Sequence, residues 1–308
     1  MQRYIEGRSQ PFSWFLYILP ALLVYLIFLA YPLFSSMLTS FMTGNHAQIQ
    51  TFVGFDNYVR LFTEEELSTR YFSAFRNTVV FFAIHMLVQN VLGMLFANFL
   101  QNKHLKGRKF YQTIIFIPAT LAIIVTGYLW KLILNPQWGA FNLILKALGS
   151  EHANFPWLGT PGVSLVVISL VSSWQWVGIP TMFFISALGN IPDELYEAAA
   201  ISGASPWQVF TNIKLPLILP TVGVVSTLTF VNNFNAFDVV FAMENVNGAP
   251  DYSTDILGTF FYRTGIAGQH PIGIPDRGMG AAVATVTFVV LIIGVALIRR
   301  ITVKRDEV

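Results

Sequence analysis

Long apolar stretches with almost no charge alternate with short polar segments along this chain of 308 residues. A helix needs about 20 mostly apolar residues to cross the hydrocarbon core of a bilayer. A β-barrel is disfavoured because the ten-residue segments of alternating hydrophobicity that its strands require are absent. The pattern therefore predicts six membrane-spanning helices, at residues 14–41, 77–102, 110–134, 162–189, 217–243 and 278–298.

The composition supports a single all-α polytopic membrane domain over residues 1–308. Apolar residues make up 54% of the chain and charged residues only 11%, whereas roughly a quarter is charged in soluble domains. The absence of cysteine excludes thiolate metal sites and thiol nucleophiles. The basic residues are scattered between apolar spans instead of forming a stripe, which argues against nucleic acid as a partner.

The distribution of Lys and Arg predicts the orientation of the spans, because cytoplasmic segments are enriched in these residues. The two ends of the chain and the second and fourth loops carry 11 of the 18 basic residues. We therefore expect a multi-pass protein with both termini in the cytoplasm, and residues 1–13 as a cytoplasmic tail. The first span is longer than the apolar region of a signal peptide and no small-residue cleavage pattern follows it, so we interpret it as a retained helix.

The fourth loop, residues 190–216, has clear signals for two short helices. Pro192 is expected in the first turn of the first helix, and Gly203 can adopt the left-handed conformation that ends it. Ser205 and Gln208 have the spacing of a capping box for the second helix. Physical reasoning leaves two interpretations of this hairpin, namely an interfacial element lying on the bilayer or an element that inserts into a groove on another protein.

The same loop carries Glu197-Ala198-Ala199, then Gly203 after three further residues, Ile213 after nine more, and Leu215-Pro216. This pattern resembles the EAA motif of the permease subunits of binding-protein-dependent ABC importers. Segments before the fourth loop and in the fifth span, including Phe234 to Asp238, are similar to the carbohydrate branch of these permeases. One departure lies at Asn245 to Pro250, where the family usually has a Thr-x-Gly-Gly-Pro type of turn. The resemblance implies the type I ABC importer permease (MetI-like) fold. The motif positions are Glu197, Ala198, Ala199, Gly203, Ile213, Leu215 and Pro216.

The resemblance also implies partners in the inner cell membrane. The hairpin would be the coupling element that docks on an ATPase subunit, with Glu197 as its polar contact and small residues permitting close approach. A second homologous permease subunit, two ATPase subunits and a periplasmic or lipid-anchored solute-binding protein would complete the assembly. The chain has no G-x-x-x-x-G-K-[ST] motif. We therefore expect that it is not an enzyme, that it binds no cofactor, and that ATP and Mg²⁺ bind to the partner ATPase.

Polar residues cluster in the fifth span, where their burial is costly unless they face a cavity or a partner helix. In a continuous helix, Asn232, Asn235 and Asp238 would lie within one sector of about 120°. Asn and Asp side chains can each hold two sugar hydroxyls, although the asparagines could instead hydrogen-bond between helices. The candidate substrate contacts are Thr229, Asn232, Asn233, Asn235 and Asp238, with Trp174 and Trp176 as apolar platforms, and the resemblance adds Val177, Gly178 and Thr181. We interpret His85, in the second span, as a packed neutral core residue.

Together these features predict half of the translocation pathway of an ATP-driven oligosaccharide importer that works by alternating access. A neutral sugar is favoured because the central parts of the fourth and fifth spans contain no Lys or Arg. Glycerol phosphate, or another polyol or anionic sugar, is the alternative. A secondary transporter is less consistent with a chain that shows no internal repeat, and an intramembrane enzyme would need more than one deep histidine.

Overall fold

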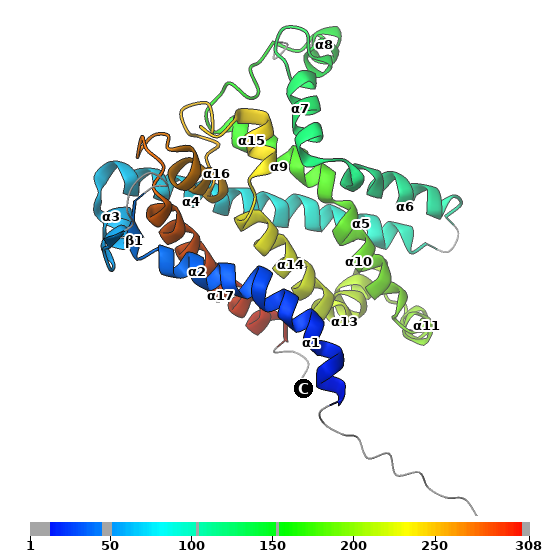
Figure 1. Ribbon diagram of the computed structural model, residues 1–308. Coiled ribbons are helices and arrows are strands. Elements are labelled where there is room, and N and C mark those ends of the chain that lie inside the picture. The colour runs from blue at the N-terminus through cyan, green and yellow to red at the C-terminus, as the bar shows by residue number, and fades with distance from the viewer. Residues whose placement is uncertain (1–12, 45–50, 103–104, 152–153, 304–308) are drawn as a thin grey trace, which may run out of the picture.

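The computed structural model describes residues 13–44, 51–102, 105–151 and 154–303. They form an α-helical bundle (Figure 1). Within these residues, three helical runs are long and apolar enough to cross a membrane, and three bent pairs raise the number to six if each pair is one span. The predicted tail at residues 1–13 lies, apart from Ser13, outside the described residues.

The three unbroken runs correspond to the first, second and sixth predicted spans. The second run begins at Glu65, well before the expected start at Asn77. Its first turn carries Glu65 and Glu66, and acidic side chains are favourable at the positive end of the helix dipole. The runs are α1 (Ser13–Tyr25), η1 (Leu26–Ala30) and α2 (Tyr31–Thr39); α4 (Glu65–Ile84), η2 (His85–Asn90) and α5 (Val91–Leu100); and α17 (Arg277–Val303).

The other three runs are bent by 96°, 46° and 69°, and a proline lies close to each break. Proline lacks the backbone N–H and clashes with the carbonyl four residues before it, so Pro180 and Pro220 account for the second and third bends. The first bend lies just after Pro118, at Leu121 and Ala122, whose backbone is extended. The runs are α6 (Arg108–Phe116), η3 (Ile117–Thr120) and α7 (Ile123–Ile133); α9 (Val163–Trp176) and α10 (Gly178–Gly189); and α12 (Pro206–Val209), η4 (Phe210–Lys214), α13 (Leu215–Leu217) and α14 (Leu219–Phe234).

The prediction of one continuous helix over residues 217–243 is wrong. The helix α14 ends at Phe234, and a separate helix, α15 (Asp238–Glu244), follows. Asn235 ends α14 by donating its side-chain amide to the carbonyl of Val231 (3.0 Å). Asp238 therefore does not share a continuous helical face with the asparagines before it, although the chain still brings it to the same cavity.

The remaining elements connect the long runs. Figure 1 shows α8 at the top of the view, whereas the start of α1, the end of α17 and α11 all lie in its lower part. The helices α14 and α17 pack along each other, as do α5 and α10. The connecting elements are β1 (Met42–Thr43), antiparallel to β2 (Thr51–Phe52), and the helices α3 (Asp56–Thr63), α8 (Ala140–Ala147), α11 (Asp193–Ile201), α16 (Leu257–Tyr262) and η5 (Arg263–Ala267).

Candidate functional site

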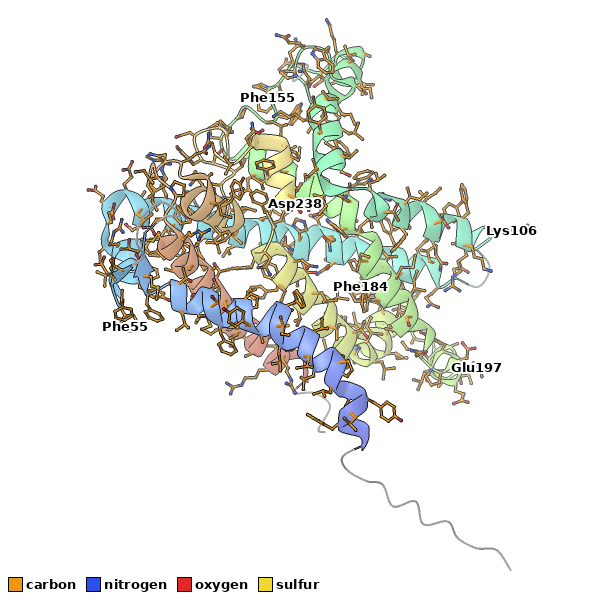
Figure 2. All side chains as sticks on the ribbon, in the orientation of Figure 1. Phe55, Lys106, Phe155, Phe184, Glu197 and Asp238 are labelled. Atoms are coloured by element: carbon orange, nitrogen blue, oxygen red, sulfur yellow. The ribbon has the colours of Figure 1, made fainter. Side chains whose placement is uncertain are left out.

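A cavity of about 530 Å³ lies among α4, η2, α9, α10, α14 and α15. Figure 2 labels Asp238, which stands at the start of α15 and is the one charged residue of the described lining. The lining combines amide and hydroxyl side chains with large apolar ones. Its polar members are His85, Gln89, Ser172, Thr229, Asn232, Asn233, Asn235 and Asp238, and its aromatic members are Phe81, Trp176, Phe183 and Phe237.

Six of the predicted substrate contacts line this cavity. The end of α14 supplies Thr229, Asn232 and Asn233, and Asn235 follows its last residue; α15 supplies Asp238, and α9 supplies Trp176. The side-chain amide of Asn233 donates to the carbonyl of Thr229 (2.6 Å), and its Oδ1 has no hydrogen-bond partner among the described residues. The break after Phe234 thus places polar groups of two helices around one space.

Four predicted contacts do not line the cavity in this structure. Thr181 is fully buried and donates its hydroxyl to the carbonyl of Val177 (2.7 Å). Gly178 packs against the backbone of α6, and the Trp174 ring lies edge-on to Trp130 at 5.5 Å.

Helical geometry explains why Val177, Gly178 and Thr181 do not line the cavity. The cavity-lining residues of this run are Ser172, Trp176, Ile179, Pro180 and Phe183, whose spacing places them on one helix face. Residues 177, 178 and 181 lie on a different face, turned toward neighbouring helices.

Three polar lining residues were not among the predicted contacts. His85 was interpreted as a packed core residue; it is indeed buried, and it also lines the cavity together with Gln89 and Ser172. One sequence feature could have predicted two of them: the four-residue spacing of His85 and Gln89 places two polar side chains, which are costly to bury, on one face of an apolar helix.

The loop at 190–216 folds into the predicted helical hairpin. Gly203 has a φ of +70° and ends α11 in the left-handed conformation. The hydroxyl of Ser205 accepts from the N–H of Gln208 (3.3 Å), and the Gln208 side chain accepts from the N–H of Ser205 (2.8 Å), which confirms the capping box. Pro192 occupies the N-cap position of α11, just before its first residue and one residue earlier than expected, and makes no side-chain capping bond.

The hairpin exposes most of its motif residues at one end of the bundle. Glu197, labelled in Figure 2, and Ala198 are exposed, whereas Ala199 is buried. Nζ of Lys214 donates to Asn98 Oδ1 (2.5 Å) and ties the second half of the hairpin to α5. Gly203 and Pro216 are exposed, and Ile213 and Leu215 are half-buried.

Comparison with known proteins identifies the family. Residues 89–305 match the family described as binding-protein-dependent transport system inner membrane component. The chain belongs to this family. It is 32% identical to the probable ABC transporter permease protein YurN of Bacillus subtilis, over 92% of each chain. It is also 32% identical to the trehalose/maltose transport system permease protein MalF of Thermococcus litoralis, over 90% of this chain and 89% of that protein.

A solved structure confirms the fold class of this transport family member. The crystal structure of a bacterial ABC transporter that imports the acidic polysaccharide alginate matches with a TM-score of 0.78 and 25% identity, over 96% of both chains. The all-α, six-span type I ABC importer permease (MetI-like) fold is therefore correct. The chain is an inner-membrane transport component.

Proposed function

We propose that this chain is the permease subunit of an ATP-driven importer of neutral oligosaccharides and forms half of the translocation pathway. The observation that carries the proposal is the cavity at the end of α14, where Asn232, Asn233, Asn235 and Asp238 meet aromatic side chains. Amides and a carboxylate bind sugar hydroxyls, and aromatic rings pack on the apolar faces of sugar rings. The relatives named for trehalose and maltose, and the arabinooligosaccharides permease AraP of Bacillus subtilis, 30% identical over 94% of this chain, support a sugar substrate.

The charge of the lining favours a neutral sugar over an anionic one. A phosphate or uronic acid site would be expected to present Arg or Lys. The described lining contains neither, and its one charged residue is Asp238. The volume of about 530 Å³ lies within the usual range for small-molecule sites, roughly 300–1,000 Å³.

The exposed motif residues of the hairpin at residues 190–216 support the proposal that a separate ATPase subunit supplies the energy for transport. Glu197, Ala198 and Gly203 lie on the solvent-facing part of the hairpin, where a partner could approach closely. In this proposal two ATPase subunits bind ATP and Mg²⁺, a second permease completes the pathway, and a solute-binding protein delivers the sugar. The hairpin would face the cytoplasm together with both termini, since it lies toward the same end of the bundle as the described ends of α1 and α17.

Uptake by the reconstituted complex tests this function. Proteoliposomes containing all subunits and the binding protein would be given labelled maltose, trehalose and diacetylchitobiose, with glycerol phosphate and an alginate oligosaccharide as anionic alternatives. We expect ATP-dependent uptake of a neutral sugar that stops when the ATPase is omitted and persists with a proton ionophore. Preference for an anionic solute would overturn the neutral-sugar assignment, and ATP-independent, ionophore-sensitive uptake would indicate a secondary carrier.

A matched pair of variants tests the cavity. Asn232→Ala removes a lining amide and should reduce sugar uptake several-fold. Asn247→Ala changes an exposed asparagine outside the cavity and should leave uptake unchanged. Equal uptake by the two variants would contradict a sugar site at the end of α14.

A further inference from the structure

The second helical run changes its winding where it meets the cavity. Residues His85–Asn90 form the π-helical segment η2 between α4 and α5. Such segments inside α-helices occur frequently at functional sites. Two side chains of η2, His85 (2% exposed) and Gln89 (6% exposed), line the cavity, although they belong to a different run from the asparagines of α14.

His85 fixes the orientation of a hydroxyl group on α9. Its Nδ1 lies 2.8 Å from the carbonyl oxygen of Phe81, which can only accept, so Nδ1 carries the proton and donates it. In the neutral imidazole, Nε2 then accepts from the hydroxyl of Ser172 (3.0 Å). The proton of Ser172 is therefore engaged by His85, and its oxygen is left as an acceptor on the cavity wall.

Gln89 has an uncommitted carboxamide. Its side chain makes no hydrogen bond with any residue that the structure describes, although the residue is only 6% exposed and lines the cavity. Its neighbour Asn90 is different, because it pairs with Thr229 on α14 through contacts of 3.1 and 3.2 Å. The carboxamide of Gln89 is thus available to the cavity, where a pair of ligand hydroxyls would satisfy both its donor and its acceptor.

We propose that Gln89 and Ser172 form a second sugar-contacting wall of the cavity, with His85 as the residue that positions Ser172. The inference rests on the proposed function. Gln89 donates to one hydroxyl of the sugar and accepts from an adjacent one, and Ser172 accepts from a third. Together with the asparagines, this wall holds a polyhydroxylated ring through contacts from two separate helical runs, and all of its groups are neutral.

The cysteine-free chain allows a direct test. Gln89→Cys, Asn232→Cys and, as the control, Asn247→Cys would each be placed in the full reconstituted complex and labelled with a water-soluble thiosulfonate. Asn247 is exposed in the segment that follows α15 and does not line the cavity. Labelling of this chain would be measured with and without maltose, trehalose and diacetylchitobiose delivered by the binding protein.

We expect a transported sugar to slow labelling of both cavity cysteines at least about fivefold and to leave the control unchanged. Protection of Asn232→Cys alone, or failure of Gln89→Cys to react without sugar, would overturn the second wall and leave the proposed function standing. Protection at neither cavity position by any of these sugars would overturn the proposed function itself.

Transport kinetics provide the second measurement. Gln89→Leu should raise KM for the transported sugar about 5- to 10-fold with little change in kcat, since one neutral hydrogen-bonding partner is lost. Gln112→Leu, the same change at a half-buried residue of α6 outside the cavity, should not. His85→Phe should raise KM as Ser172→Ala does, and combining the two changes should raise KM little further. Ser172→Thr retains the hydroxyl and should therefore change KM less than Ser172→Ala. Independent, additive effects of His85 and Ser172 would overturn the positioning role.

Discussion

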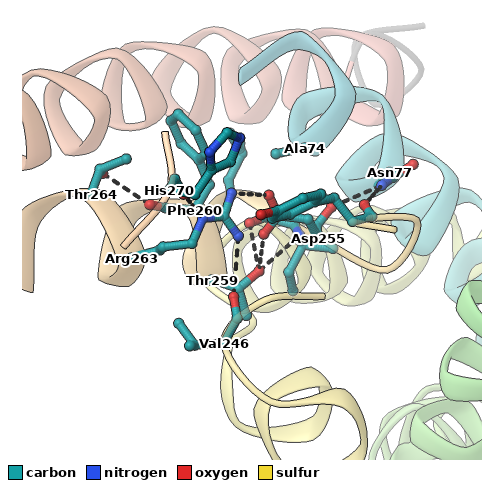
Figure 3. A network of polar contacts seen from close by, with 12 residues as sticks. Ala74, Asn77, Val246, Asp255, Thr259, Phe260, Arg263, Thr264 and His270 are labelled. Atoms are coloured by element: carbon teal, nitrogen blue, oxygen red, sulfur yellow. Dashed lines mark hydrogen bonds and ion pairs between the residues drawn. The ribbon is translucent and has the colours of Figure 1, made fainter. Parts of the chain in front are cut away.

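The carboxylate of Asp255 and the guanidinium of Arg263 form an ion pair that is almost completely buried, with 2.6 Å between Oδ2 and Nη2 (Figure 3). The guanidinium also donates to the carbonyls of His270 (2.6 Å) and Val246 (3.1 Å). Asp255 Oδ1 accepts from the hydroxyl of Thr259 (2.7 Å). One arginine thus joins three parts of the segment between α15 and α17.

This network also attaches the segment to α4. The side-chain amide of Asn77 donates to the backbone carbonyls of Asp255 (2.9 Å) and Ser253 (3.2 Å), and the hydroxyl of Thr78 accepts from the N–H of Leu257 (2.9 Å). The start of α16 is therefore fixed against α4, beside the break that separates α14 from α15.

Arg263→Met should destabilise the protein strongly, because it leaves a buried carboxylate and two carbonyls without their donor. Breaking a buried pair in this way costs about 3–5 kcal/mol. The measurement is the melting temperature of the purified subunit in detergent, and the double variant Asp255→Leu with Arg263→Met should recover part of the loss.

The exposed pair Arg60–Glu64 provides the control. Its side chains are 35% and 52% exposed, and such pairs contribute about 0–1 kcal/mol. Glu64→Gln should therefore shift the melting temperature little. A similar shift for Arg263→Met and Glu64→Gln would show that the buried network does not hold this segment in place.

Gly258→Ala should alter the cavity from a distance. A Cβ at this position would collide with the backbone oxygen of Ala236, which itself lines the cavity. The substitution therefore forces the break between α14 and α15 to move, and sugar affinity should fall in the uptake assay. Gly189→Ala is the matched control, since its Cβ would have the Gln101 amide as its nearest neighbour at an ordinary 3.6 Å. Equal KM values for the two variants would contradict this coupling.

These contacts explain which parts of the fold could be predicted. Apolar length located the six runs, and prolines such as Pro180 are local signals for the bends. The end of α14 at Phe234 was not predicted, because the sequence from 217 to 243 is apolar enough to read as one helix. The loop around Gly258, far away in the sequence, packs against the break, and local patterns carry no information about such a contact.

The candidate site likewise contains residues that local sequence could predict and residues whose position depends on distant parts of the chain. Clustering of costly polar groups singled out Asn232, Asn233 and Asp238 but left interhelical hydrogen bonding as an alternative, and the family resemblance favoured a cavity. The resemblance alone gave Val177 and Thr181, but the α9–α10 bend turns a different face to the cavity. Lone polar side chains such as His85 read as core, because their cavity role depends on which neighbours α9 brings beside them.

Thr229→Val should lower the stability of the protein, because it removes the hydroxyl on α14 that pairs with the side-chain amide of Asn90 on η2. Leaving one buried amide without its hydroxyl partner costs about 1–3 kcal/mol, whereas replacing both partners by apolar groups can be nearly neutral. Thermal unfolding should therefore show partial recovery in Asn90→Leu with Thr229→Val. In Thr287→Val, the control, the lost hydroxyl bonds only the carbonyl of Val283 in its own helix (2.9 Å), so the effect should be small. A larger loss in the double variant than in Thr229→Val would refute the pairing.

Gly203→Trp, a change in the hairpin, should leave the subunit folded but impair the coupling of ATP hydrolysis to sugar uptake. Apart from its two neighbours in the chain, no described residue has an atom within 4 Å of a Cβ placed at Gly203, so a bulky side chain meets open space in the described part of the subunit. The backbone adopts a left-handed φ of +70°, which costs a non-glycine residue about 1–2 kcal/mol and is tolerated best by Asn. Gly203→Asn is therefore the control for backbone strain.

If the hairpin docks on an ATPase, Gly203→Trp should lower the subunit's melting temperature by only the few degrees that the left-handed backbone costs, but should lose most sugar uptake per ATP hydrolysed. Gly203→Asn should retain more of this uptake. Glu197→Lys should reduce the same ratio without affecting the isolated subunit, because its exposed side chain supports no described packing. Both ratios follow from parallel uptake and phosphate-release assays on the reconstituted complex. Normal uptake per ATP in Gly203→Trp would exclude close approach of a partner at this position, since an indole cannot occupy the space that such a contact would require.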